Sequence, residues 1–309
     1  MQLEVIDRRT LAENIVEFTL ASANGAALPP AEPGAHITVE TPAGCKRRFS
    51  LVHPDPAPAT YTIAVKRESD SRGGSASMHD EALTGSRLEV EEPGNEFPLS
   101  ASGPVLLIAG GIGITPIYAM AQQLKADNRP FRLIYCTRSA EQTAYAEELE
   151  ALCEGNLVLH HDGGDIDAAF DFWDVFAEPT AEHVFCCGPS PLMEEVKAVS
   201  GHWPEGRIHF EDFKPVEAVR ENDKPFIVTL AKTGAEVRVP ADRTILEALR
   251  DAGYRLPSSC ESGTCGTCKT GLLEGEVEHR DMVLMDDEKA DKIMICVSRA
   301  VGDRLVLDI

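Results

Sequence analysis

The sequence lacks long hydrophobic runs. Nowhere does it offer the roughly 18 consecutive apolar residues that a membrane-spanning helix requires. The first 20 residues carry scattered charges and no apolar segment of the kind found in export signals. Internal repeats and low-complexity tracts are absent as well. We therefore expect a protein of folded domains that does not enter a membrane and that stays in the cytoplasm.

Positive charge is also scarce. The chain has 29 Lys and Arg against 51 Asp and Glu, which gives a formal net charge of -22. Affinity for phosphate backbones comes from Lys and Arg that displace counterions, so nucleic acid and anionic membranes are not expected partners. A protein partner with a basic docking face fits better, although the acidity equally serves solubility alone.

The cysteines lack the signs of a disulfide framework. Nine is an odd number, and without an export signal it favours metal binding or catalysis. Structural zinc sites usually pair two C-x2-C knuckles, and here only Cys265 and Cys268 form one. Four other cysteines indicate nothing beyond packing: Cys45, Cys136, Cys153 and Cys186.

What the chain does have is a ladder of four cysteines: Cys260, Cys265, Cys268 and Cys296. The spacing C-x4-C-x2-C, followed by a distant fourth cysteine, is that of plant-type 2Fe-2S clusters. The thiolates must converge on two irons, and Gly263 and Gly266 allow the loop to wrap closely around them. Zinc or four buried thiols are the alternatives. The ladder predicts a 2Fe-2S cluster, which carries a single electron.

Length and hydrophobic patterning predict a multidomain protein, because single cores stop growing well before 309 residues. Short β-prone runs between Gly- and Pro-rich turns, at 15–20, 36–40, 49–52, 61–66 and 87–92, predict a small antiparallel barrel over residues 1–102. Continuous apolar runs separated by helix-like stretches, at 105–109, 131–137, 157–161, 183–187 and 207–210, predict an α/β parallel sheet over 103–213. We expect a linker at 214–224 and a third domain at 225–309, opening with a hairpin and a helix at 244–252.

The barrel carries two candidate flavin-binding segments. A single-electron carrier fused to further domains needs a group that accepts hydride and releases electrons singly, and flavin is the usual converter. The first segment is an RRFSL run, formed by Arg47, Arg48, Phe49, Ser50 and Leu51. The second is a GGSAS loop, residues 73–77, with the composition of a phosphate cradle. A solvated strand face and a flexible turn are the alternatives.

The second domain carries two glycine turns at strand ends. Residues 105–109 run into GGIGITP, with Gly111, Gly113 and Pro116 opening a helix-like stretch. Amide dipoles at such a helix start bind pyrophosphate, although the turn is not a GxGxxG fingerprint and a tight structural turn would also need the glycines. A later strand ends in Cys187, Gly188 and Pro189. Cys187 is either a packing residue or part of a nicotinamide pocket.

With these motifs in this order, the chain resembles the phthalate dioxygenase reductase family, whose relatives include vanillate O-demethylase reductases. The resemblance covers essentially all 309 residues. It implies an FMN-binding barrel, an NADH-binding domain and an α+β ferredoxin domain of the β-grasp type. The family's R-x-Y-S motif falls on Arg47 to Ser50, with Phe49 where the pattern prefers Tyr.

The resemblance also implies roles for individual residues. Those expected at FMN are Arg47, Arg48, Phe49, Ser50, Ala64, Val65, Lys66, Gly73, Gly74, Ser75 and Phe213, with Thr115 near both flavin and nicotinamide. Cys187, Gly188 and Pro189 would shape the hydride-transfer pocket, and Ser50 and Cys187 would position the reacting atoms. Thr137 and Arg138 fall where the adenosine ribose lies. An Arg there suits a 2'-phosphate, yet the family uses NADH, which we favour.

We therefore expect an NADH-dependent oxidoreductase that passes electrons through FMN and a 2Fe-2S cluster to the terminal oxygenase of a two-component Rieske-type system. A redox sensor that exports no electrons, and a flavin-dependent reductase acting directly on a small substrate, are the alternatives. The sequence names neither the oxygenase's substrate nor the oligomeric state.

Overall fold

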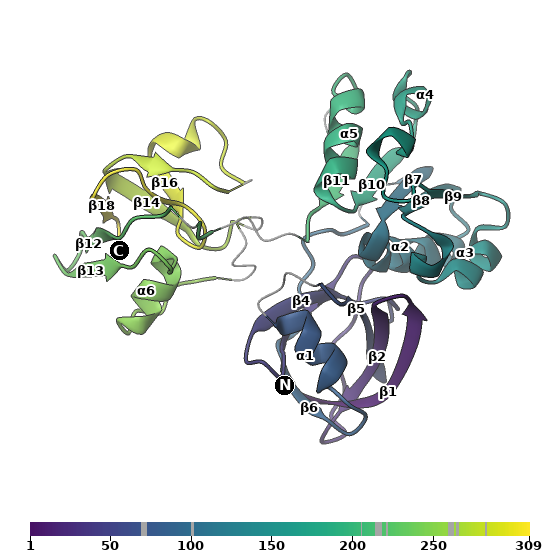
Figure 1. The fold of residues 1–309 in the computed structure, drawn as a ribbon, viewed down its shortest axis with the longest axis horizontal. Coiled ribbons are helices and arrows are strands. Elements are labelled where there is room, and N and C mark those ends of the chain that lie inside the picture. Colours follow the sequence, from purple (N-terminus) through teal and green to yellow (C-terminus); the bar gives the residue numbers. More distant parts are fainter. Residues whose placement is uncertain are drawn as a thin grey trace. The chain divides into compact units, whose positions relative to one another are not determined.

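The structure is a computed structural model of the whole chain, shown as a ribbon in Figure 1. It describes residues 1–68, 73–99, 102–204, 206–213, 218–220, 222–258, 263, 266–281 and 283–309. The chain divides into two compact units, Met1–Phe213 and Lys214–Ile309. Among the described residues, no helix is both long and apolar enough to cross a membrane.

The first part of unit 1 is a six-stranded antiparallel sheet, in the order β4-β3-β6-β1-β2-β5. An isolated bridge between Leu51 and Ile63 connects the two ends of this order, which curls the sheet into a barrel. Leu3, Phe18 and Ile37 lie fully buried inside it. Its elements are β1 Gln2–Ala12, β2 Ile15–Ser22, β3 His36–Glu40, β4 Lys46–Ser50, β5 Thr60–Lys66, α1 Gly74–Asp80 and β6 Arg87–Val90.

The second part of unit 1 is a five-stranded parallel sheet in the order β11-β10-β7-β8-β9. Its central strand β7 is buried throughout, as expected for a sheet with both faces covered. The strands are β7 Val105–Gly110, β8 Phe131–Thr137, β9 Leu157–His161, β10 His183–Cys187 and β11 Ile208–Glu211. The helices are α2 Ile114–Ala126, α3 Ala146–Cys153, α4 Trp173–Phe176 and α5 Ser190–Ser200, with short 3-10 turns at Gly111–Gly113, Ala140–Gln142 and Ile166–Ala168.

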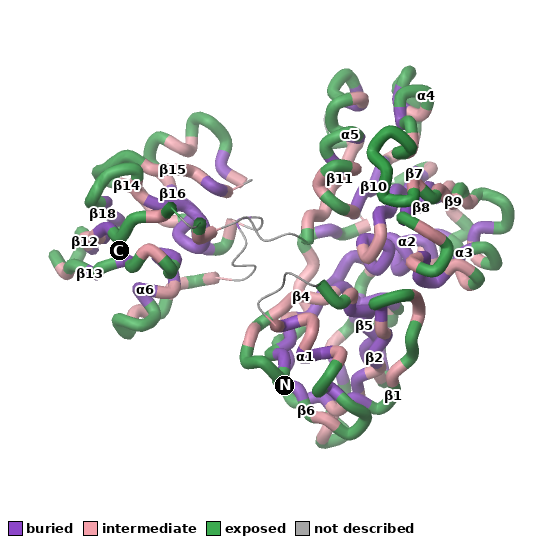
Figure 2. The backbone as a smooth tube through the Cα atoms, viewed as in Figure 1, coloured by how far each residue is buried: buried purple, intermediate pink, exposed green. Residues whose placement is uncertain are grey.

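These two parts of unit 1 are joined by polar contacts between residues far apart in sequence. The hydroxyl of Tyr145 donates to Glu17 Oε2 at 2.7 Å, and Arg9 bonds both Glu17 at 3.0 Å and Glu148 at 2.9 Å. Gln122 on α2 donates to the backbone carbonyl of Val52 at 2.8 Å. In Figure 2, much of β5 and of α2 is coloured as buried. The barrel and the parallel sheet therefore share a fixed boundary.

Unit 2 is built on a mixed five-stranded sheet in the order β13-β12-β18-β14-β16. Its helix α6 begins with a capping box, in which Thr244 Oγ1 accepts from the Glu247 amide and Glu247 accepts from the Thr244 amide. The elements are β12 Phe226–Leu230, β13 Glu236–Val239, α6 Ile245–Asp251, β14 Lys269–Glu274, β15 Val277–Glu278, a 3-10 turn Glu288–Ala290, β16 Lys292–Met294, β17 Arg299–Ala300 and β18 Arg304–Leu307.

A buried ion network attaches the start of unit 2 to its core. Asp223 pairs with Arg280 at 2.6 Å and with Arg299 at 3.2 Å, and all three side chains are at least 90% buried. The hydrogen bonds from Arg280 lower the pKa of Asp223 to about 2. Arg280 also donates to the carbonyl of Ala218. The described residues of the expected linker at 214–224 are thus bound to the third domain.

The three-domain fold class is confirmed, and most strands lie where the pattern placed them. The runs expected at 36–40, 131–137, 157–161 and 183–187 match β3, β8, β9 and β10 residue for residue. In unit 1, two strands differ from the expected runs by more than two residues. The pattern offered no strand at β1, because the second half of that strand is charged and faces solvent. The strand expected at 49–52 is β4, which starts at Lys46, since an edge strand of a barrel tolerates charge.

Candidate functional site

Ser50 ends β4 with its side chain inside the barrel wall. The residue is 5% exposed, and its Oγ is buried without a hydrogen-bond partner among the described residues. A buried hydroxyl left in this state costs free energy unless a further group bonds it. The orphaned Oγ therefore fits a bound polar ligand such as the edge of a flavin ring.

Arg47 and the start of α1 form a second part of the same site. A Cβ added at Gly74 would meet Arg47 Nε at 3.0 Å, so the guanidinium group packs directly over this glycine. Gly73, which precedes it, has a φ of 87°, a conformation that favours glycine. A cation lying over a glycine turn at a helix start is suited to a phosphate group. The structure brings together two motifs about 25 residues apart.

Most of the other residues expected at the flavin lie on β4, β5 and α1. Ala64 and Val65 are buried on β5, whereas Lys66 pairs with Glu68 at 3.0 Å. Arg48 pairs with Glu96 at 2.6 Å, so a carboxylate already balances its charge. The remaining two are Phe49, half-buried on β4, and Ser75, whose Oγ accepts from the Glu68 amide.

The two glycine turns of the parallel sheet lie against each other. A Cβ on Gly113 would lie 2.2 Å from the carbonyl oxygen of Cys187, and one on Gly110 would lie 2.5 Å from Pro189 Cδ. No side chain fits at either position, which explains the glycines in physical terms. Thr115, on the first turn of α2, is buried and donates to the Ile112 carbonyl at 3.1 Å. The carboxyl ends of β7 and β10 thus form one edge, where open α/β sheets bind ligands.

The other residues predicted at this edge lie around the same turns. Gly111 has a φ of 52°, Pro116 is buried on α2, Gly188 approaches Gly110 closely and Pro189 precedes α5.

Glu211 is a residue at this edge that sequence reasoning missed. It ends β11 and pairs in register with Cys187, which is fully buried and whose thiol pKa burial raises well above 9. Glu211 Oε2 is buried and has no hydrogen-bond partner among the described residues. Burial raises the pKa of Glu211 to about 8, opposed by the charge of Arg48. A carboxyl group in an otherwise apolar strand was the available signal, in the run HFE.

The two residues expected near the adenosine ribose, Thr137 and Arg138, lie in different environments. The hydroxyl of Thr137 is buried and already engaged with Thr143 at 2.7 Å and with His161 at 2.8 Å. Arg138 is exposed and lies near Gly164. Phe213 is 40% exposed at the end of unit 1, and its predicted place over the flavin stays a prediction.

Two of the four ladder cysteines, Cys260 and Cys265, lie outside the described residues. The other two, Cys268 and Cys296, are 4% and 1% exposed in the core of unit 2. Gly263 and Gly266 have φ of 76° and 80°, and a Cβ on Gly263 would lie 2.8 Å from Val297 Cγ2. Two buried thiols beside a glycine loop held in left-handed conformations fit a cluster of the expected kind.

Comparison with known proteins supports the NAD-binding domain and the 2Fe-2S domain. Residues 228–301 match the 2Fe-2S iron-sulfur cluster binding domain, and residues 107–161 match the oxidoreductase NAD-binding domain. The chain is 49% identical to phthalate dioxygenase reductase from Burkholderia cepacia, over 100% of this chain and 97% of that protein. It is 50% identical to the phthalate 4,5-dioxygenase oxygenase reductase subunit from Pseudomonas putida, over 99% and 96%.

A solved phthalate dioxygenase reductase structure superposes on this chain with a TM-score of 0.85 and 48% identity, covering 100% of this chain and 98% of the other. Fold and site together define a modular oxidoreductase with flavin, NAD-binding and 2Fe-2S domains. The chain belongs to the phthalate dioxygenase reductase family. It is an NAD-dependent reductase that moves electrons through flavin to a 2Fe-2S centre, as its motifs predicted.

Proposed function

We propose that this chain takes electrons from NADH, passes them through FMN and its 2Fe-2S cluster, and delivers them to the terminal oxygenase of a two-component Rieske-type system. The relative from Pseudomonas putida is named as the reductase subunit of an oxygenase, which supports this partner. In this assignment residues 1–102 bind FMN, 103–213 bind NADH and 225–309 hold the cluster. NADH supply favours a cytoplasmic location.

The observation that carries the flavin assignment is the orphaned Oγ of Ser50. Bound FMN would supply the conversion of a two-electron hydride into single electrons. Ser50 would donate a hydrogen bond to the reactive edge of the ring, and Arg47 with Gly73, Gly74 and Ser75 would hold the phosphate. Phe49, Ala64, Val65, Lys66 and Phe213 would pack along the ring, and Arg48 would stay paired with Glu96. The Phe at position 49 keeps ring packing without a hydroxyl.

The choice of FMN over FAD rests on the family. The solved relative is described as transferring electrons from pyridine nucleotides to 2Fe-2S, which is the sequence proposed for this chain. Four thiolates, from Cys260, Cys265, Cys268 and Cys296, would ligate the two irons. Only the last two of these are described, and both are buried.

NADH would bind at the edge made by β7 and β10. The amides of Gly111 and Gly113 and the helix start at Pro116 would face its pyrophosphate. Cys187, Gly188 and Pro189, with Thr115, would position the nicotinamide against the flavin. Cys187 acts through packing, since its buried thiol keeps its proton at neutral pH. Arg138 and Thr137 would lie near the ribose, with Thr137 supporting the loop through its existing hydrogen bonds.

The test is an anaerobic titration of the purified protein with NADH, followed by visible absorption and electron paramagnetic resonance. The proposal expects the flavin to bleach, a rhombic reduced-cluster signal to appear, and about three electrons to be taken up, two on flavin and one on the cluster. The proposal fails if the flavin bleaches without a cluster signal in protein shown to contain iron and sulfide. A parallel titration with NADPH tests the nucleotide, because a much slower bleaching is expected.

A further inference from the structure

The negative charge of this chain is unevenly distributed between its two units. Residues 1–213 contain 33 Asp and Glu against 15 Lys and Arg, whereas residues 214–309 contain 18 against 14. The unit from which electrons leave is therefore close to balanced. Most of the chain's net negative charge therefore belongs to unit 1. It does not determine the charge of the partner that binds unit 2.

Most basic side chains of unit 2 are already neutralised by carboxylates. Ion pairs whose two members are both described involve Arg220, Lys232, Lys269, Arg280, Lys289, Lys292, Arg299 and Arg304. Arg250 is engaged as well. Arg255 is exposed, and its side chain has no ion pair or hydrogen bond with any described residue. It therefore carries positive charge that is available to a partner.

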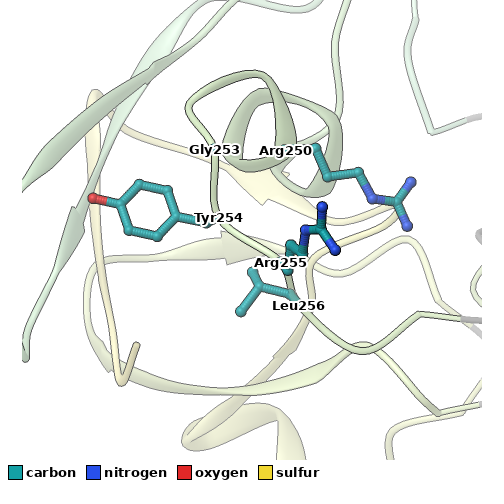
Figure 3. A pocket seen from close by; sticks show the side chains of 5 residues that line it. All are labelled: Arg250, Gly253, Tyr254, Arg255 and Leu256. Atoms are coloured by element: carbon teal, nitrogen blue, oxygen red, sulfur yellow. The ribbon is translucent and has the colours of Figure 1, made fainter.

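Arg255 lies in the segment that connects α6 to the cysteine loop. A surface hollow there is lined by Arg250, Gly253, Tyr254, Arg255 and Leu256, with no carboxylate among these residues. Figure 3 shows both guanidinium groups on one side of the segment and the ring of Tyr254 on the other. Arg250 donates to Ser258 Oγ, which attaches the end of α6 to the residues just before Cys260. The described part of this segment is thus held to α6 as far as Ser258.

We propose that this hollow, which we call the Arg250–Arg255 hollow, is the place where an acidic segment of the terminal oxygenase docks. The proposal rests on the proposed function, since it concerns the last transfer of electrons out of the chain. The guanidinium group of Arg255 can bind a carboxylate in a planar, two-bond geometry, which fixes orientation as well as attraction. Leu256 and Tyr254 add apolar contact beside the charges. Docking within five residues of Cys260 in sequence would bring the acceptor near the cluster.

The requirements of electron transfer to the acceptor favour docking at this hollow. Complementary charge mainly speeds encounter and selects the partner, while the electron itself needs a short path. A positive hollow on the segment that leads in sequence into the cysteine ladder would meet both requirements for an acidic acceptor. A partner with a basic face, which the overall charge of the chain favours, would be repelled at this position.

The test compares Arg255→Glu with a matched control, Arg238→Glu. Arg238 is exposed on β13 of the same unit, and no described residue forms an ion pair with it. The acceptors are cytochrome b5, an acidic haem protein, and cytochrome c, a basic one. We expect Arg255→Glu to raise KM for cytochrome b5 about tenfold with kcat nearly unchanged, and to leave KM for cytochrome c equal or lower. Arg238→Glu should change either value less than twofold.

Two further readouts separate the possible failures. Arg255→Lys keeps the charge and should recover most of the affinity, and added salt should raise KM for the native protein more than for Arg255→Glu. Ferricyanide reduction by NADH and the reduced-cluster signal should be unchanged in every variant. The inference is overturned if Arg255→Glu leaves KM for cytochrome b5 unchanged, or if Arg238→Glu raises it equally. If the native protein reduces neither cytochrome although NADH bleaches its flavin, the proposed function itself fails.

Discussion

Tyr145 donates a hydrogen bond to Glu17 Oε2 at 2.7 Å, although the two residues are 128 positions apart. Glu17 belongs to the barrel and Tyr145 to the parallel sheet's connection into α3. Both are almost completely buried, and Arg9 bonds the same carboxylate. This contact holds the barrel and the parallel-sheet part of unit 1 in one arrangement.

The first prediction concerns this contact. Tyr145→Phe removes the hydroxyl and leaves Glu17 paired with Arg9 alone. We expect the free energy of unfolding of unit 1 to fall by about 1.5–3 kcal/mol, the usual range for a hydrogen bond to a charged group. Urea denaturation followed by flavin fluorescence measures it. The control is Tyr61→Phe, whose hydroxyl bonds the neutral Pro29 carbonyl within the barrel, and whose loss should cost less, about 0.5–1.5 kcal/mol.

The second prediction concerns Ser50. Ser50→Ala removes a hydroxyl that has no partner among the described residues, so protein stability should change by less than about 0.5 kcal/mol. The rate of flavin reduction by NADH should fall about tenfold, which corresponds to the loss of about 1.4 kcal/mol in the transition state. Stopped-flow absorption measures the rate, with Ser22→Ala as control. An unchanged rate would remove Ser50 from the mechanism.

The third prediction concerns the pH dependence that Glu211 imposes on folding. Burial raises its pKa to about 8 in the folded protein, against an ordinary value of 4.5. Between these values the folded state holds a proton that the unfolded chain has released, so stability falls as pH rises from about 5 to 8. Arg48 and Glu96 are the charged groups that act on this carboxyl, with opposite effects.

Glu211→Gln keeps the shape and removes the titration. We expect its free energy of unfolding to be flatter with pH than that of the native protein, the difference approaching about 1.4 kcal/mol per pH unit. Denaturation at pH 5.5, 6.5 and 7.5 measures the slope. Equal slopes in the two proteins would show that Glu211 is ionised in the folded state, against this prediction. Glu89→Gln, at an exposed position, should leave the slope unchanged.

The fourth prediction concerns the buried ions of unit 2. Asp223→Asn leaves Arg280 and Arg299 buried without their shared carboxylate, and we expect unit 2 to lose about 3–5 kcal/mol. This loss of stability is measured by following the cluster's visible absorption as denaturant is added. Asp308→Asn, which breaks an exposed pair with Lys232, should cost less than about 1 kcal/mol. If the two variants lost a similar amount of stability, the prediction that burial makes the Asp223 pairs more important than an exposed pair would be wrong.

The same carboxylate predicts acid sensitivity. The hydrogen bonds from Arg280 lower the pKa of Asp223 to about 2 in the folded protein, from 3.8. Its contribution to stability is therefore complete above pH 4 and is lost as pH falls toward 2. Asp223→Asn should remove this part of the acid transition.

The sequence by itself determined those features that depend only on residues close together in the chain. The strands at β3, β8, β9 and β10, the glycine turns and the capping box at Thr244 follow from hydrophobic periodicity and backbone chemistry, which act over a few positions. The cysteine spacing belongs to the same kind, because three of the four cysteines lie within a few residues of one another in the sequence. These features were sufficient to predict the three-domain fold, with an NAD-binding domain and a 2Fe-2S domain.

Tertiary structure decided which distant groups meet. Gly113 needs to be glycine because the carbonyl of Cys187 lies against it, and no local rule relates positions 74 residues apart. Glu211 acquires its raised pKa, and Asp223 its lowered one, only through the burial and partners that packing supplies. Arg255 is available for a partner because other basic residues of its unit found carboxylates in space. Local patterns specify elements, whereas pairwise electrostatics and contact depend on distances that exist only in the folded chain.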